Sequence, residues 1–118
     1  MMAAPLPSIG AAELGRKLST RQPVILLDVR EPSELSLARI DDHRLAVVPL
    51  SRLASEGTKA LPPQASSPDT EILVLCHHGN RSAAVTEWLI RNGWSRVFNV
   101  SGGIDAYARE TDPRVGLY

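Results

Sequence analysis

The sequence predicts an α/β fold in which helices cover both faces of a parallel sheet. Four short apolar runs are the candidate strands: Val24–Val29, Leu45–Pro49, Ile72–Cys76 and Val97–Val100. Nearly continuous apolar runs of this kind are typical of strands buried on both faces, as in a parallel sheet. Segments with helical signals separate these runs, and alternation of strands with helices is the pattern of a parallel α/β sheet.

The first candidate helix is Ser8–Thr20, with Ser8 as its expected cap and Pro23 beyond its end. Pro32 suits the first position of a short helix that continues through Ser33–Ala38. Three further helices are expected at Ser51–Ser55, Ala83–Asn92 and Ile104–Arg109.

The length of 118 residues predicts a single domain, because a chain of this size buries one core but not two. We expect residues 1–7 to form a loose lead-in and residues 111–118 an irregular tail. Lys59–Thr70 is rich in proline and serine and is predicted to be a surface loop.

The composition argues against several classes of partner. Thirteen basic residues balance thirteen acidic ones, so no field attracts nucleic acid or an anionic membrane. No apolar run is long enough to span a membrane, and the N-terminus lacks the pattern of a secretory signal. The single cysteine excludes an internal disulfide and fits a reducing compartment, so we expect a cytoplasmic protein. Nothing in the sequence determines the oligomeric state.

Cys76 ends an apolar strand and precedes a tight loop that leads into a helix. Backbone amides of such a loop and the N-terminus of the helix stabilise anions, so they favour a thiolate. Gly79 permits a turn that directs amides inward, and Arg81 supplies a cation that can bind an anionic substrate. Ser82 is placed to cap the helix. The residues alone leave two interpretations open, a reactive cysteine in an anion pocket and a buried core thiol.

No metal or cofactor is expected. His43, His77 and His78 are too few and wrongly spaced for a metal site, and adjacent histidines usually point in different directions. His77 and His78 either raise the local positive potential or face water. Gly102 and Gly103 lack the surrounding fingerprint of a phosphate-binding loop and predict a plain turn.

Three stretches, in this order and spacing, resemble the rhodanese family: LLDVREPSEL, CHHGNRSA and WLIRNGWSRVFNVSGGIDAY. The resemblance extends over roughly residues 9–107. It implies a three-layer sandwich, with a central parallel sheet of about five strands and helices on both faces.

The resemblance also implies a function, a sulfurtransferase in which Cys76 carries sulfur as a persulfide. The donor would be a sulfane-sulfur compound such as thiosulfate, and the acceptor an external thiol or protein. Asp28 and Arg30 match hallmark positions of the family, where a charged pair supports the active loop. The substrate-binding loop would consist of His77, His78, Gly79, Asn80, Arg81 and Ser82.

The chain departs from the family pattern in two places. Residues 38–43 replace a segment that usually reads Gly-His-Ile-Pro-Gly-Ala, so we expect a distorted connection beside the substrate mouth. The active loop lacks the second strong cation of thiosulfate-preferring members, which predicts that thiosulfate is a poor donor.

Two alternatives to a sulfurtransferase remain. One is a sulfur-relay or regulatory binding module with little small-molecule turnover, because fold and motif do not fix function. The other is a phosphatase or arsenate reductase. The loops of those enzymes hold one residue more between cysteine and arginine than the four residues found here, which leaves this loop short of room for a tetrahedral oxyanion.

Overall fold

Five parallel strands form one sheet in the computed structural model, which describes residues 5–118. Their order across the sheet is β1-β5-β4-β2-β3, and every neighbouring pair is parallel. The strands are β1 (Ser8–Ile9), β2 (Ile25–Asp28), β3 (Leu45–Val47), β4 (Ile72–Leu75) and β5 (Val97–Val100). Residues 1–4 of the expected lead-in lie outside the described residues.

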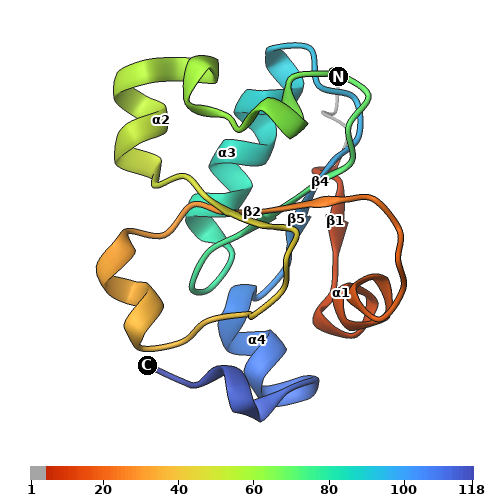
Figure 1. Cartoon of the computed structure of the whole chain (residues 1–118), viewed down its shortest axis with the longest axis vertical. Helices are drawn as coiled ribbons and strands as arrows, with labels where there is room; N and C mark the ends of the chain where they lie inside the picture. The colour runs from red at the N-terminus through yellow and green to blue at the C-terminus, as the bar shows by residue number, and fades with distance from the viewer. Residues whose placement is uncertain (1–4) are drawn as a thin grey trace.

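Helices cover both faces of this sheet, so the predicted three-layer architecture is confirmed. The helices are α1 (Ala11–Leu18), α2 (Leu50–Glu56), α3 (Asn80–Arg91) and α4 (Gly103–Glu110). Figure 1 shows α2 and α3 on one side of the strands, with α1 and α4 on the other. Short 3-10 turns occupy Pro32–Ser36, Gly57–Ala60, Pro63–Ala65 and Pro113–Val115. None of the helices in residues 5–118 has the length and apolar character that crossing a membrane requires.

The central strand β4 explains why the apolar runs are continuous. Leu73 and Leu75 contribute to the core under α1 and α4, whereas Ile72 and Val74 contribute to the core under α2 and α3. Successive side chains of a strand point to opposite faces, so a strand covered on both faces needs apolar residues at every position.

The N-terminal segment differs from the prediction. Ser8 is not the cap of the first helix, because it lies in β1 and Gly10 occupies the N-cap position. The amides of Asn99 and Ser101 donate to the carbonyls of Pro7 and Ile9, at 2.8 and 2.9 Å. These hydrogen bonds extend the sheet by an edge strand that is too short to show periodicity in the sequence.

Helix α3 begins at Asn80, three residues before the predicted start at Ala83. Gly79 is its N-cap, with a φ of 99° that favours glycine. Ser82 therefore lies within the first turn and is not the cap that the sequence predicted. This shift leaves the Ser82 hydroxyl available for contacts in the candidate site.

The tail contains the turn Pro113–Val115 and packs against the segment that departs from the family pattern. The Val115 carbonyl accepts a hydrogen bond from the Arg39 amide at 2.9 Å. A Cβ at Gly116 would approach the Leu37 carbonyl oxygen to 2.6 Å, so the two segments lie in close contact. The tail thus packs against this connection, and it is irregular apart from the short turn at Pro113–Val115.

Candidate active site

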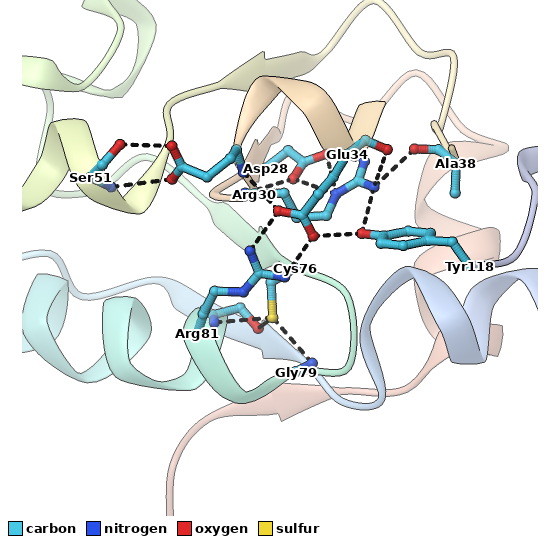
Figure 2. Close-up of polar contacts among 11 residues, drawn as sticks. Asp28, Arg30, Glu34, Ala38, Ser51, Cys76, Gly79, Arg81 and Tyr118 are labelled. Atoms are coloured by element: carbon cyan, nitrogen blue, oxygen red, sulfur yellow. Dashed lines mark hydrogen bonds and ion pairs between the residues drawn. The ribbon is translucent and has the colours of Figure 1, made fainter. Parts of the chain in front are cut away.

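The Cys76 thiol lies at the carboxyl end of β4, at the N-terminus of α3 (Figure 2). The backbone amide of Gly79 donates to Sγ at 3.1 Å, and that of Ser82 at 3.3 Å. The Ser82 hydroxyl lies 3.2 Å from the same sulfur. Two amides and a hydroxyl therefore converge on one sulfur atom that is itself buried, with Cys76 only 1% exposed. Such donors stabilise negative charge on sulfur.

The first residues of helix α4 hydrogen-bond to the Cys76 loop. The amides of Ile104 and Asp105 donate to the carbonyls of Cys76 and His77, at 2.9 and 3.1 Å. Gly103, with a φ of 63°, lets the two backbones approach, because a Cβ there would clash with the His77 carbonyl and lie 2.5 Å from that of Cys76. The loop carbonyls of Cys76 and His77 are thus held by amides at the start of α4.

A buried polar pair supports the Cys76 loop from β5. The Ser82 hydroxyl donates to Asn99 Oδ1 at 2.6 Å, and Asn99 Nδ2 donates to the Gly79 carbonyl at 3.3 Å. With the Ser82 proton directed to Asn99, the thiol can donate to the Ser82 oxygen. When Cys76 is a thiolate, the same hydroxyl can turn and donate to sulfur.

Arg81 forms a bidentate ion pair with a carboxylate. Its Nη1 and Nη2 bond to the two oxygens of Glu34 at 2.7 and 2.9 Å. The bidentate bonds from Arg81 are the main reason that the pKa of Glu34 falls to about 2, and the same pairing raises the pKa of Arg81. Binding of a donor by Arg81 stays a prediction, and a donor that uses the two N–H groups bonded to Glu34 must compete with that carboxylate.

Asp28 and Arg30 form a buried ion pair, with 2.7 Å between Asp28 Oδ2 and Arg30 Nη2. Arg30 also donates to the Ala38 carbonyl at 2.9 Å and to the Tyr118 hydroxyl at 3.1 Å. Burial works to lower the pKa of Arg30, but its hydrogen bonds with Asp28 and Tyr118 outweigh burial and raise it. The Tyr118 hydroxyl in turn donates to Glu34 at 2.8 Å. This chain of contacts connects the hallmark pair to Arg81, as Figure 2 shows.

The two histidines of the loop lie together, contrary to the expectation that they point apart. The His77 ring is 3.8 Å from that of His78 between centroids, and it stacks on Tyr118 at 3.7 Å with an angle of 6°. His77 Nε2 is buried and has no hydrogen-bond partner within residues 5–118. His78 and Asn80, in the same loop, are exposed to solvent.

Asp105 brings a third metal-ligating side chain close to these histidines. One ligand atom from each of His77, His78 and Asp105 lies within 4.8 Å of the others. Asp105 is already bonded to Arg109 at 3.0 Å, and His78 faces solvent, so the group offers a metal only two histidine nitrogens and a shared carboxylate. His43, the third histidine, lies elsewhere, beside Asp42.

Sequence reasoning missed three residues of the site: Glu34, Asn99 and Tyr118. Asn99 gave a signal, since it is a polar residue inside an otherwise apolar strand. A polar side chain at a buried position needs a hydrogen-bond partner. Glu34 and Tyr118 gave none, because their partners lie 47 and 84 positions away along the chain.

The fold and the site define a class of protein, the α/β domains that hold one cysteine in an amide-lined loop at the carboxyl edge of a parallel sheet. A family model described as the rhodanese-like domain matches residues 10–110. The chain therefore belongs to the rhodanese-like domain family.

Known proteins similar to this chain agree with that assignment. The chain is 30% identical to a sulfurtransferase of Allochromatium vinosum, over 91% of this chain and 92% of that protein. It is 36% identical to the chloroplastic rhodanese-like/PpiC domain-containing protein 12 of Arabidopsis thaliana, over 97% of this chain but 38% of that protein. A crystal structure of a rhodanese-related protein from Thermoplasma volcanium superposes with a TM-score of 0.72 at 36% identity, covering 89% of this chain and 93% of the other.

Proposed function

We propose that this protein is a sulfurtransferase in which Cys76 accepts a sulfane sulfur and passes it on. The observation that carries the proposal is the convergence of the Gly79 amide, the Ser82 amide and the Ser82 hydroxyl on Cys76 Sγ. These donors can stabilise negative charge on the Cys76 sulfur, which is the nucleophile, and on one added sulfur atom.

The reaction has two steps. With thiosulfate, the Cys76 thiolate attacks the outer sulfur, the bond between the two sulfur atoms of the donor breaks, and sulfite leaves with the electron pair of that bond. The product is a Cys76 persulfide anion. A thiolate or cyanide then attacks the outer sulfur of this persulfide, and the Cys76 thiolate is released. This cycle is double displacement through a covalent intermediate.

The acceptor must be a separate molecule, because the chain has no second cysteine to attack the persulfide. We propose a low-molecular-weight thiol or a protein thiol as acceptor. A reducing compartment such as the cytoplasm would keep both the acceptor and Cys76 reduced.

Intact-mass measurement after incubation with a sulfane-sulfur donor tests this proposal. We expect the wild type to gain the mass of one sulfur atom, to lose it on addition of cyanide, and to release thiocyanate. Cys76→Ser should gain nothing under the same conditions. An aryl phosphate should not be hydrolysed, because four residues separate Cys76 from Arg81. Hydrolysis of the phosphate ester without any gain of sulfur would overturn the proposal in favour of a phosphatase.

The pairing of Arg81 with Glu34 favours a second candidate, a relay module with little turnover of small donors. Both Nη atoms of Arg81 are bonded to Glu34, at 2.7 and 2.9 Å, so this guanidinium offers less attraction to a small anion. A relay module would load slowly from every small donor and rapidly from a partner protein that carries a persulfide. The ratio of these two loading rates separates the candidates.

A further inference from the structure

Glu34 occupies the edge of Arg81 formed by Nη1 and Nη2, where an anion could otherwise accept two parallel hydrogen bonds. Four donors satisfy its carboxylate: the two guanidinium nitrogens of Arg81 at 2.7 and 2.9 Å, the Tyr118 hydroxyl at 2.8 Å, and the Glu31 amide at 2.9 Å. Since the pKa of Glu34 lies at about 2, this carboxylate is ionised at neutral pH. The Arg81–Glu34 pair is therefore held firmly and carries no net charge.

The other guanidinium of this network, that of Arg30, is also paired with a carboxylate. Arg30 is 0% exposed and bonded to Asp28. Both arginines that the hallmark motif and the active loop bring to the site are thus neutralised by carboxylates. A dianion that approaches Cys76 can accept hydrogen bonds from loop amides, but both guanidinium groups of this network are already paired with carboxylates. The network therefore attracts the dianion only weakly.

We propose that Glu34 is a specificity-determining residue that selects against anionic sulfur donors and favours donors without net negative charge. This inference rests on the proposed sulfurtransferase function. To form paired hydrogen bonds at the edge of Arg81 that Glu34 occupies, thiosulfate must displace a carboxylate that accepts four hydrogen bonds, and the displaced carboxylate then repels the donor. A donor without net charge does not depend on attraction to the Arg81 guanidinium, so it does not have to displace Glu34. Glu34 therefore does not hinder the approach of such a donor.

The hydropersulfide of cysteamine is a suitable comparison, because its ammonium group offsets charge on its sulfur. Cys76 attacks the outer sulfur of this donor, the sulfur–sulfur bond breaks, and cysteamine thiolate leaves with the electron pair. The Cys76 product has the same composition as the one from thiosulfate. Any difference between the donors therefore lies in their approach and leaving groups.

The experiment measures the rate constant for gain of one sulfur by intact mass, with thiosulfate and with cysteamine hydropersulfide. The variant is Glu34→Gln, which keeps the shape of the side chain and removes its charge. The matched control is Glu87→Gln, the same change at an exposed position on α3 where Glu87 contacts Arg91 at 3.4 Å. Both variants raise the net charge by one, so the control removes the effect of overall charge.

We expect Glu34→Gln to raise the ratio of the thiosulfate rate to the hydropersulfide rate by about tenfold or more. Glu87→Gln should leave the ratio within about twofold of the wild type, since exposed ion pairs have weak effects. Tyr118→Phe removes one hydrogen bond from Glu34 and keeps the ring on His77, so it should raise the ratio less than Glu34→Gln. This second variant provides the test if Glu34→Gln does not fold.

Three outcomes would overturn the inference. An unchanged or lower ratio in a folded Glu34→Gln would show that Glu34 does not select the donor, while sulfur gain in the wild type would leave the proposed function intact. An equal rise in Glu87→Gln would assign the effect to overall charge. Failure of the wild type to gain sulfur from either donor would remove the proposed function, and this inference with it.

Discussion

At the scale of single residues, the hydroxyl of Ser82 has two partners. It lies 3.2 Å from Cys76 Sγ and donates to Asn99 at 2.6 Å. Ser82 is completely buried, so neither contact has water as an easy substitute. The Ser82 hydroxyl thus contacts the Cys76 sulfur and also provides a hydrogen-bond partner for the buried side-chain amide of Asn99.

Ser82→Ala should lower the rate of persulfide formation by about tenfold, because one donor to the sulfur is lost while both amides remain. It should also cost about 1–2 kcal/mol of unfolding free energy, since Asn99 loses a buried partner. Thr86→Val is the control, because Thr86 is a buried hydroxyl of the same helix that donates to the Ser82 carbonyl at 2.8 Å. Urea titration and intact mass should show a stability loss in both variants and a rate loss in Ser82→Ala only. Equal rates in the two variants would contradict a role for the hydroxyl at the sulfur.

At the scale of elements, the start of α4 contacts the cysteine loop, as the start of α3 does. The amide of Ile104 at this start donates to the Cys76 carbonyl at 2.9 Å. The approach is so close that a side chain at Gly103 would meet the Cys76 carbonyl oxygen at 2.5 Å. The turn that the sequence predicted at Gly102–Gly103 therefore forms one wall of the site.

Gly103→Ala should destabilise the protein by about 3 kcal/mol, since it combines a positive φ with overpacking against backbone. Gly93→Ala is the matched control, because Gly93 also has a positive φ, of 104°, but nothing lies within 4 Å of a Cβ there. The control should lose only about 1 kcal/mol. Thermal or urea unfolding measures both losses. Similar losses in the two variants would mean that the contact between α4 and the cysteine loop is less tight than the structure indicates.

At the scale of the whole molecule, Glu34 joins three distant parts of the chain. It lies in the turn Pro32–Ser36 and bonds to Arg81 on α3 and to Tyr118 at the C-terminus. Burial is the largest influence on the pKa of Tyr118 and raises it, so the phenol stays protonated and able to donate at neutral pH. The network thus joins the Pro32–Ser36 turn, α3 and the C-terminus beside the Cys76 loop.

This network predicts a pH-dependent contribution to stability. The pKa of Glu34 falls from 4.5 to about 2 on folding, mainly through Arg81, so the folded state favours the ionised form. The contribution is fully present above pH 4.5 and is lost as the pH falls through about 2. Since Arg81 is 33% exposed, we expect about 2 kcal/mol after allowance for screening by solvent.

Urea unfolding of the wild type and Glu34→Gln between pH 7 and pH 2 measures that contribution. The wild type should be more stable at neutral pH, and the difference should shrink across the window between the two pKa values. Comparing the variant with the wild type cancels the other carboxylates whose pKa values folding lowers, such as Asp42 and Asp105. A difference that is independent of pH would contradict the role of the ionised carboxylate.

Four of the five strands, all but β1, and the cysteine loop could be predicted from local sequence. The run Ile72–Cys76 is apolar at every position because both faces of β4 are buried, and Cys76 follows the strand at the edge where parallel sheets place their ligands. The starts of α1 and α3 were predicted less accurately than the strands, each three residues from its observed position. The start of α3 depends on the φ of Gly79, which local signals did not distinguish from a serine cap.

The sequence by itself determined the sheet class and the identity of the buried thiol, because both depend on periodicity and residue type within a few positions. Only the tertiary structure decided that Arg81 is bonded to Glu34, that Asn99 supports Ser82, and that the last residue, Tyr118, stacks on His77. The physical reason is the large separation of these partners along the chain. A hydrogen-bond pattern between residues far apart in the chain exists only after the core has formed, and the charge of a side chain does not reveal which partner will neutralise it.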